Sequence, residues 1–428
     1  MIKNSDYKIK YKSYEQSLNF DRLGQKEKDF IEQKAQKHFF SFSELRQIVE
    51  IAVDLKMWQE GRIDEIWPEI DKNLNPKELK KEIISFLKNY WQKLKNSPIK
   101  FQTDTSYNTR KISIFEKNKD KLGFGMCPVA SPKTRCCNLM TLDAVESCGF
   151  DCSYCSIQSF YNEDKIIFDK DFKKKLQQIK IDPNEIYHIG TGQSSDSLMW
   201  GNRYGILDAL MEFASKYPNV ILEMKTKSKQ INYFLENEIP KNVIFTWSLN
   251  PQKVIDHEEH LTASLKERLE AAKKLHDKGM IVGFHFHPMI YYEGWEKEYK
   301  DIACFLTENF DPDRVAMVSI GTLTFIKSVI KKIRGRDFYS KILQIPLIDA
   351  DGKLSYTKEI KTEMFKHLYD SFYKWHDKVY FYLCMENHSL WKDVFGYEYP
   401  TNESFEMDMK LNYLRKISNR KKVSAHTV

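Results

Sequence analysis

The pattern of hydrophobic and polar positions divides the chain into a helical beginning, an alternating centre and a mixed end. Up to about residue 100, apolar residues recur every three to four positions, as in KEKDFIEQKAQKHF, which predicts amphipathic helices. From residue 141, short apolar runs alternate with amphipathic segments of helix length. We predict strands at 141–147, 186–190, 219–225, 242–249, 281–287 and 314–320, and helices at 203–216, 262–279 and 296–309.

Strands that alternate with helices of this length predict a parallel β-sheet. The six units fit an open partial barrel or a flat doubly wound sheet, because both have this periodicity. Ser264 with Glu267 predicts a capping box at the start of the helix at 262–279. We expect three parts: a mainly helical region at 1–140, the β/α region at 141–334, and a mixed α+β region at 335–428 in which DGKLSYTKEIK predicts a hairpin or turn and VYFYLCME a strand.

The composition is that of a large globular protein. The chain has 428 residues, 42% hydrophobic and 14% aromatic, which is enough for two or three domains. No run approaches the roughly 18 apolar residues of a membrane helix. The first residues, MIKNSDYKIKYKSYEQS, lack the apolar centre of a signal peptide. We therefore expect a soluble, cytoplasmic protein without a membrane segment.

The net charge of +7 is unevenly distributed. Residues 71–121 contain 13 basic and 6 acidic residues, so this stretch equals the excess of the whole chain. Aromatic residues lie among the lysines: Tyr90, Trp91, Phe101, Tyr107 and Phe115. Such a mixture suits phosphate contacts and base stacking, and suggests DNA or RNA as a partner. A lysine-rich solvated helix surface is the alternative.

Six of the eight cysteines fall between Cys127 and Cys155. Cys148, Cys152 and Cys155 have C-x3-C-x2-C spacing and follow the first predicted strand directly. Structural zinc sites use four protein ligands, whereas three thiolates on one loop can hold three corners of a cube-shaped cluster and leave one iron open. Cys127, Cys136 and Cys137 either bind a second metal or are buried small hydrophobes, and we favour the latter. We expect Cys304 and Cys384 in the core.

This loop, with Tyr154 before its last cysteine, resembles that of the radical S-adenosylmethionine (SAM) superfamily. Within it, the chain is similar to the spore photoproduct lyase family in CGFDCSYCSIQ, SSDSL at 194–198, TKS at 226–228, WSLNP at 247–251, TASLKERLEAAKK at 262–274 and VGFHFHPMIYYEGWE at 282–296. The resemblance implies a six-unit partial β/α barrel with a helical N-terminal region and a mixed C-terminal extension. It implies a 4Fe–4S cluster that reductively cleaves SAM to a 5′-deoxyadenosyl radical, with flavodoxin or ferredoxin as electron donor. It also implies lyase-like chemistry on nucleic acid, in DNA lesion repair or base modification.

Carried over position by position, the resemblance assigns roles to individual residues. The cluster ligands are Cys148, Cys152 and Cys155, and Tyr154 is the candidate catalytic residue. The SAM contacts are Ser195, Asp196, Lys227, Ser248 and Asn250, which follow predicted strands, where barrel sites lie. Each of these contacts has the alternative of a polar loop residue that caps a helix.

Two departures from the family affect the expected reaction. The family's hydrogen-donor cysteine is replaced by Gln193, and the tyrosine that follows the last cluster cysteine is replaced by Ser156. A glutamine cannot donate a hydrogen atom as a thiol does. A radical SAM enzyme acting on a peptide or small metabolite therefore stays an alternative, as does a non-catalytic, cluster-containing binding protein. His285 and His287 share one face of a strand and either touch substrate or cofactor or fill a polar layer of the barrel.

Overall fold

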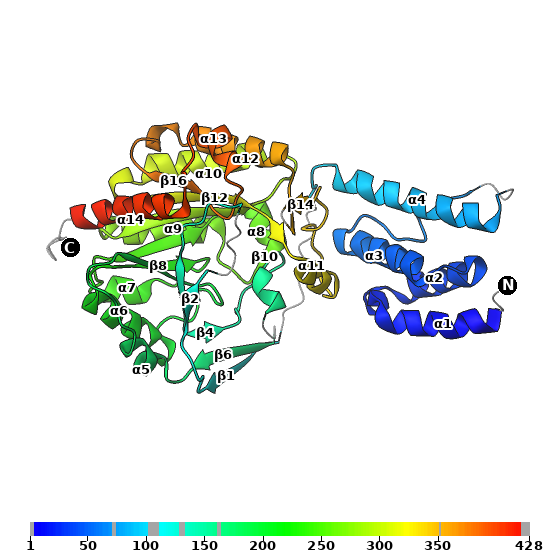
Figure 1. Ribbon diagram of the computed structural model, residues 1–428, viewed down its shortest axis with the longest axis horizontal. Coiled ribbons are helices and arrows are strands. Elements are labelled where there is room, and N and C mark those ends of the chain that lie inside the picture. Colours follow the sequence, from blue (N-terminus) through cyan, green and yellow to red (C-terminus); the bar gives the residue numbers. More distant parts are fainter. Residues whose placement is uncertain are drawn as a thin grey trace.

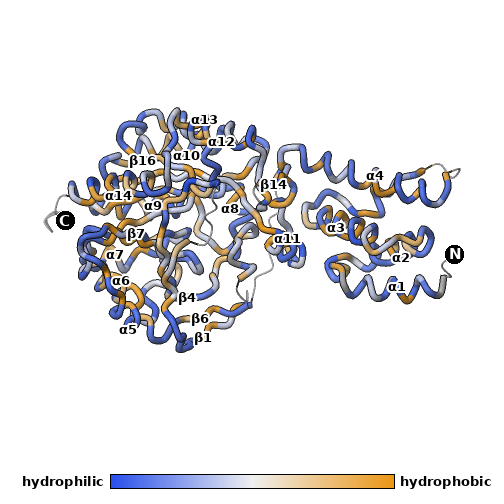
Figure 2. Tube along the Cα trace, in the orientation of Figure 1, coloured by the Kyte–Doolittle hydropathy of each residue, from blue (hydrophilic) through white to orange (hydrophobic). Residues whose placement is uncertain are grey.

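The computed structural model describes residues 4–70, 74–101, 111–127, 133–160, 164–350 and 352–420. The chain begins with a separate helical lobe (Figure 1), whose described helices are α1 (Asn4–Ser17), α2 (Gln25–His38), α3 (Phe42–Trp58) and α4 (Pro76–Lys95). The lobe has its own hydrophobic core, which includes Phe40, Leu45 and Leu87. Hydrophobic and hydrophilic positions alternate along these helices in Figure 2, as expected for helices with one buried face. The helical beginning of the chain is therefore confirmed.

The central sheet contains the predicted strands side by side in chain order, all parallel: β3 (Met140–Asp143), β7 (Tyr187–Thr191), β8 (Val220–Thr226), β9 (Val243–Ser248), β11 (Ile281–Met289) and β12 (Val315–Thr322). At one edge β16 (Tyr380–Leu383) adds a parallel strand, and at the other β2 (Gly123–Met126) pairs antiparallel with β3. A doubly wound sheet would break the chain order. The order observed is that of a singly wound, partial β/α barrel, which confirms the predicted fold class.

The helices that connect these strands lie on the outside of the sheet (Figure 1). They include α6 (Ile206–Lys216), α7 (Asn232–Glu236), α8 (Gln252–Glu258), α9 (Leu265–Asp277) and α10 (Trp295–Asn309). The predicted capping box is present at α9, where the Ser264 backbone N–H donates to the Glu267 carboxylate at 2.9 Å. Gly279 follows α9 with a φ of 82°, a conformation that favours glycine.

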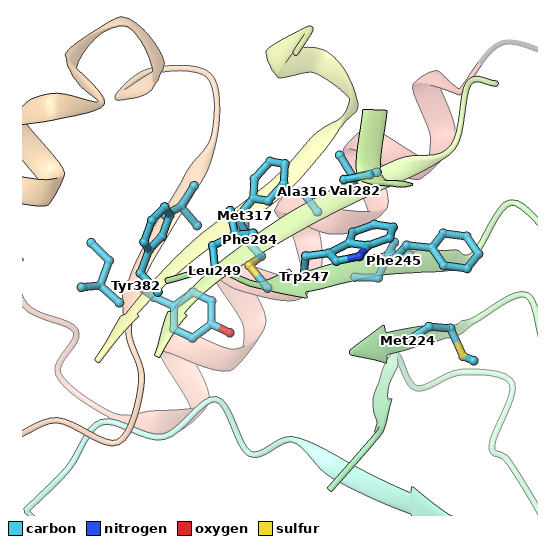
Figure 3. Close-up of a cluster of buried hydrophobic side chains, with 14 of the residues drawn as sticks. Met224, Phe245, Trp247, Leu249, Val282, Phe284, Ala316, Met317 and Tyr382 are labelled. Carbon is cyan, nitrogen blue, oxygen red and sulfur yellow. The ribbon is translucent and has the colours of Figure 1, made fainter. Parts of the chain in front are cut away.

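The strands are buried on both faces, which explains their continuous apolar runs. Every residue of β9 and β12 is buried. Figure 3 shows Trp247, Phe284 and Met317 projecting from neighbouring strands into one hydrophobic cluster. This packing fixes the ends of the strands, where the predicted site residues lie.

One predicted strand is wrong in its extent. The run at 141–147 is divided into β3 and β4 (Val145–Glu146), and β4 pairs antiparallel with β6 (Lys165–Asp169) in a separate small sheet with β1 (Ser113–Lys117). The chain leaves the central sheet after Asp143, whose carboxylate accepts a hydrogen bond from the Ser194 backbone N–H at 2.9 Å. This side chain therefore serves the loop after β7 rather than continuing a strand.

The C-terminal region packs against the barrel. Its elements are the hairpin β14 (Ile348–Ala350) and β15 (Lys353–Ser355), α12 (Lys358–Ser371), α13 (Ser389–Phe395) and α14 (Asn402–Asn419), and they follow α11 (Lys327–Arg334), the last helix of the β/α region. The hairpin and the β16 strand confirm the predictions for this region. α14 contacts both β8 and β12, and the ring of its Tyr413 lies 5.4 Å from the ring of His188.

The helical lobe is tied to the barrel by a buried ion pair. The guanidinium of Arg334 in α11 donates two hydrogen bonds of 2.8 Å to the two carboxylate oxygens of Asp54 in α3. Trp91 of α4 donates its indole N–H to the same carboxylate at 3.0 Å. A bidentate contact of this kind fixes orientation as well as proximity.

Among the described residues, no helix is long and apolar enough to cross a membrane.

Candidate active site

The loop of the three cysteines is fixed by backbone pairing with a distant segment. β5 (Asp151–Cys152) pairs antiparallel with β10 (Glu259–His260). The Ser153 N–H donates to the Glu258 carbonyl at 2.9 Å, and the Cys155 N–H donates to the Cys152 carbonyl at 3.2 Å. The cysteines therefore sit on a tight, supported turn.

The three thiols are free of disulfides and lie near one another. Cys152 interacts electrostatically with both Cys148 and Cys155, and the Cys148 Sγ lies 3.9 Å from the Met199 Sδ. Burial, with a smaller contribution from Asp196, raises the pKa of the Cys148 thiol to about 12. Bound iron would replace these protons.

Three cysteines on one turn are a possible set of ligands for an iron–sulfur cluster. Among the described residues, no three histidine, cysteine or carboxylate side chains are gathered tightly enough to hold one metal ion. An iron–sulfur cube takes its thiolates at separate corners, so three cysteines spread over one turn suit it. The loop is closely packed against Met199 at Gly149, because a Cβ at this position would lie 2.3 Å from the Met199 side chain.

Glu259, which the sequence analysis did not identify, is the centre of the site. Its carboxylate accepts hydrogen bonds from the Tyr154 phenol and, at 2.7 Å, from the Asn250 amide. The Arg268 guanidinium lies 2.6 Å away, and both side chains are fully buried. Burial alone would raise the pKa of Glu259, but Arg268 and Lys227 lower it to about 2. Glu259 is therefore a fixed anion beneath the cysteine loop.

Lys227 lies on the other side of the same anion. Burial opposes its charge, but Glu259 and Cys152 stabilise the ammonium and the net effect raises its pKa. Its Nζ lies 5.7 Å from the centre of the Tyr154 ring. The structure thus brings together Tyr154, Lys227 and Asn250, three of the residues predicted from the sequence.

Asp196 organises its own loop. Its carboxylate accepts hydrogen bonds from the backbone N–H groups of Leu198, at 2.9 Å, and Lys227, at 2.6 Å, and from the Thr226 hydroxyl at 2.7 Å. Ser195 accepts a hydrogen bond from the Trp200 indole at 3.0 Å. These contacts hold the loop after β7 against the end of β8, so Asp196 supports a loop rather than capping a helix.

Ser248 and Asn250 lie at the end of β9 and are both buried. The Ser248 carbonyl accepts a hydrogen bond from Arg268 at 2.9 Å. The Asn250 side chain both donates to Glu259 and accepts from the Tyr299 hydroxyl at 2.7 Å. Both residues therefore support the Glu259–Arg268 pair.

The paired histidines differ in environment. His285 is buried, and its ring contacts the Ser319 hydroxyl at 2.5 Å and the Glu223 carboxylate at 2.8 Å. Glu223 also contacts His188 at 2.8 Å, so these side chains form a polar layer inside the barrel. His287 is half-buried, and burial, followed by Lys225, lowers its pKa well below the usual range. For His285 the structure favours the polar-layer interpretation.

Four further cysteines gather where the two edges of the sheet approach each other. The segment before β3 reaches the segment after β16 through an antiparallel bridge between Thr134 and Asn387. The thiols of Cys136 and Cys137 share a hydrogen bond, and Cys384 interacts electrostatically with Cys127 and Cys136. Cys384 lies just past the end of β16, and Cys304 lies within α10. Both are half-buried, so the expectation that they are core residues is wrong.

Gln193, the residue at the position of the family's hydrogen-donor cysteine, follows a sharp turn after β7. Gly192 before it has a φ of 88°, and a Cβ there would lie 2.7 Å from the Lys225 carbonyl oxygen. Gln193 is half-buried in this turn. The backbone is thus held tightly at the position where the side chain departs from the family.

Comparison with known proteins shows which family the central part of this chain resembles. Residues 139–344 match the family model described as spore photoproduct lyase. The chain is 26% identical over 166 residues to the spore photoproduct lyase of Clostridium acetobutylicum, covering 38% of this chain and 49% of the relative. It is 32% identical over 81 residues to that of Bacillus subtilis, covering 19% of this chain and 24% of the relative. The chain thus spans about half or less of the length of the curated relatives it matches.

Solved structures agree in fold. A cysteine-to-alanine mutant of spore photoproduct lyase superposes with a TM-score of 0.54 at 20% identity, over 63% of this chain and 82% of that chain. A double mutant with bound AdoMet and dinucleoside spore photoproduct gives 0.52 at 21% identity over the same shares. The chain therefore shares the fold of these solved spore photoproduct lyases. Over residues 139–344 it is similar to the spore photoproduct lyase family.

Proposed function

We propose that this chain is a radical SAM enzyme that reductively cleaves SAM and acts on nucleic acid with lyase-like chemistry. The observation on which the proposal rests is the convergence of Tyr154, Asn250, Lys227 and Arg268 on Glu259 beneath the three-cysteine loop. Cys148, Cys152 and Cys155 are the ligands of a 4Fe–4S cluster. When bound, the cluster supplies the electron that breaks the sulfonium bond of SAM and yields the 5′-deoxyadenosyl radical.

The chain's own residues bind and orient SAM in this proposal. The Lys227 ammonium, stabilised by Glu259, suits the carboxylate of the methionine moiety. Asp196 and Ser195 form one wall by holding the loop after β7, and Ser248 and Asn250 form the other at the end of β9. Glu259 already contacts Tyr154, Asn250 and Arg268 before any ligand binds, so this part of the site is preorganised. Tyr154 is the candidate catalytic residue, with its phenol held by Glu259.

Nucleic acid is the proposed substrate because the matched relatives are named spore photoproduct lyase, and one solved relative holds a dinucleoside spore photoproduct. Gln193 in place of the donor thiol means that the last hydrogen-transfer step differs from that of the family. The same residue favours a second candidate, a radical SAM enzyme for a peptide or small metabolite. A flavodoxin- or ferredoxin-type electron donor and a cytoplasmic location are part of the proposal.

The decisive experiment measures 5′-deoxyadenosine. The protein is purified without oxygen, reconstituted with iron and sulfide, and given dithionite and SAM, and the product is quantified by mass spectrometry. We expect product from the wild type and from Cys304→Ala, which changes a cysteine outside the loop, and none from Cys152→Ala. A fully loaded wild-type protein without product would overturn the enzymatic proposal. DNA carrying thymine photoproducts, compared with undamaged DNA, then tests the substrate.

A further inference from the structure

Two basic clefts meet between the helical lobe and the barrel. One has a volume of about 580 Å³ and is lined on the α11 side by Ser328, Lys331, Lys332 and Arg336. The other has a volume of about 290 Å³ and includes Arg22 and Lys56 of the lobe. Arg336 lines both, so the clefts form one continuous surface, which we name the junction cleft.

The junction cleft is positively charged. Among the described residues that line it, the basic side chains are Arg22, Lys56, Lys331, Lys332 and Arg336, and the acidic ones are Asp164 and Asp337. Arg22 pairs with Asp21 at 2.6 Å, and the Lys56 ammonium donates to the Arg22 carbonyl at 2.6 Å. The amphipathic helix α11 explains the pattern, because Val329 and Ile333 are buried and Lys331 and Lys332 are exposed. A concave surface with this excess of cations raises the local concentration of a polyanion.

Aromatic and hydroxyl groups lie among these cations. Arg336 lies 4.3 Å from the centre of the Phe338 ring, and the Tyr339 side chain is 46% exposed. Ser328 and Asn19 line the larger cleft. Cations and hydroxyls for phosphates, together with an exposed aromatic ring for a base, are what single-stranded nucleic acid requires.

The junction cleft adjoins the cysteine loop. The Arg336 guanidinium pairs with the Asp151 carboxylate at 2.6 Å, directly before Cys152, and also donates to Gln158 at 3.4 Å. By contrast, in the basic stretch at 71–121, Trp91 and Lys95 contact each other, with the Lys95 Nζ 4.3 Å from the indole. Asp71 and Tyr107 of that stretch lie outside the described residues.

We propose that the junction cleft binds the sugar–phosphate backbone of single-stranded nucleic acid and leads it to the cysteine loop. This inference rests on the proposed function, since it supplies the substrate path of that site. The bound chemistry is a phosphodiester chain, contacted by Lys331 and Lys332 in the larger cleft and by Arg22 and Lys56 in the smaller one. The exposed Tyr339 ring stacks on a base. An acidic electron-transfer protein on the same surface is the competing outcome.

The test is the binding of a fluorescent 20-nucleotide oligo-dT, alone or in a duplex, to the reconstituted full chain between 50 and 300 mM salt. The double variant Lys331→Glu with Lys332→Glu should bind the single strand at least tenfold more weakly, and the slope of log K against log salt should fall by about 1.4, or 0.7 per lost contact. Tyr339→Ala should weaken binding by about 5- to 150-fold without changing the slope, because the loss of one stacked base costs about 1 to 3 kcal/mol. Lys266→Glu with Lys274→Glu, on exposed positions of α9, is the control of equal charge.

The outcomes separate the two proposals. Weak binding in the cleft variant but not in the α9 control supports the cleft, whether or not the wild type cleaves SAM. Equal losses in both variants would overturn it, since only net charge would then matter. Unchanged oligonucleotide affinity combined with slower reduction by flavodoxin would also overturn it and reassign the surface to an electron donor. Circular dichroism unfolding of each variant shows that the fold is retained, and Lys331→Gln with Lys332→Gln provides a milder second pair.

Discussion

Arg268 and Glu259 form an ion pair of 2.6 Å in which both side chains are fully buried. Arg268 also donates to the carbonyls of Ala263, at 2.8 Å, and Ser248, at 2.9 Å. The pair therefore joins α9, the end of β9 and the strand that supports the cysteine loop. Such a pair contributes to the position of its neighbours more than to net stability.

Removing one partner of this pair should be costly. Arg268→Met removes the ion-pair partner of the buried Glu259 anion and leaves Lys227 as its remaining cation, and we expect the free energy of unfolding to fall by about 3 kcal/mol. The double variant Arg268→Met with Glu259→Met should recover much of this loss. Chemical unfolding monitored by circular dichroism measures both. Arg46→Met, at an exposed pair in α3, is the control and should change stability by about 0.5 kcal/mol or less. Equal losses in the single and double variants would contradict the prediction.

Lys227 should be required for SAM affinity. The half-buried Lys227 ammonium interacts with Glu259 and lies 5.7 Å from the centre of the Tyr154 ring, and it can form a charge-assisted hydrogen bond, whose loss typically costs about 1.5 to 3 kcal/mol. We therefore expect Lys227→Gln to weaken SAM binding by roughly 10- to 100-fold. Equilibrium binding to the reconstituted protein measures this. Lys229→Gln, two residues later and exposed, removes a lysine that pairs with Glu267 and should bind SAM normally. Similar affinities for the two variants would count against the assigned role.

The central strands could be predicted from the sequence because they are buried on both faces. The runs predicted at 219–225, 242–249 and 314–320 differ from β8, β9 and β12 by one or two residues at each end. A continuous apolar run bounded by polar residues predicts both the presence of such a buried strand and the positions of its two ends. Their spatial order could not be obtained from periodicity, since it depends on which strands pair.

The site was only partly predictable for a related reason. The three cysteines are close together in the sequence, and the other predicted site residues lie in short motifs, so both could be recognised without knowledge of the fold. The supporting strands β5 and β10 are only two residues long, and they join segments about 100 residues apart. Strands this short have no hydrophobic pattern, so their pairing could not be predicted from the sequence. Glu259 acquires its role only through this pairing. Arg268 lies within the motif TASLKERLEAAKK, but its role depends on the ion pair with Glu259, which lies outside that motif.

The polar layer around His285 should make stability depend on pH. Burial, followed by Lys225, lowers the pKa of His285 to about 4, although Glu223 acts in the opposite direction. Between its ordinary pKa and about 4, the unfolded chain binds a proton that the folded chain does not, so the free energy of unfolding falls as the pH falls. The low pKa of Glu223, which burial would raise but His188 and His285 lower, adds a loss of the same sign at lower pH.

His285→Gln should therefore reduce the difference in unfolding free energy between pH 7 and pH 4 by about 3 kcal/mol, because a shift of about 2.5 units corresponds to that value. Urea unfolding at a series of pH values measures the difference. His257→Gln, at a half-buried position of α8 outside the polar layer, is the control for loss of a histidine. An unchanged pH dependence in His285→Gln would show that this imidazole is not a buried neutral group.

Cys136 should be the most reactive of the described thiols at neutral pH. A hydrogen bond from the Cys137 thiol lowers the pKa of Cys136 below its usual range, despite the opposing effect of burial, whereas the pKa of Cys137 is raised. Because the thiolate is the nucleophile, alkylation of Cys136 by iodoacetamide should rise with a midpoint below the ordinary cysteine value of about 8.5. Mass spectrometry of peptides alkylated between pH 5.5 and 9 under anaerobic conditions gives this midpoint. Cys137→Ala removes the donor and should shift the midpoint upward, toward the ordinary value. A midpoint that stays the same in Cys137→Ala would exclude the shared proton as the cause and leave the backbone N–H of Asn138, the other group that lowers this pKa, as the source of the reactivity.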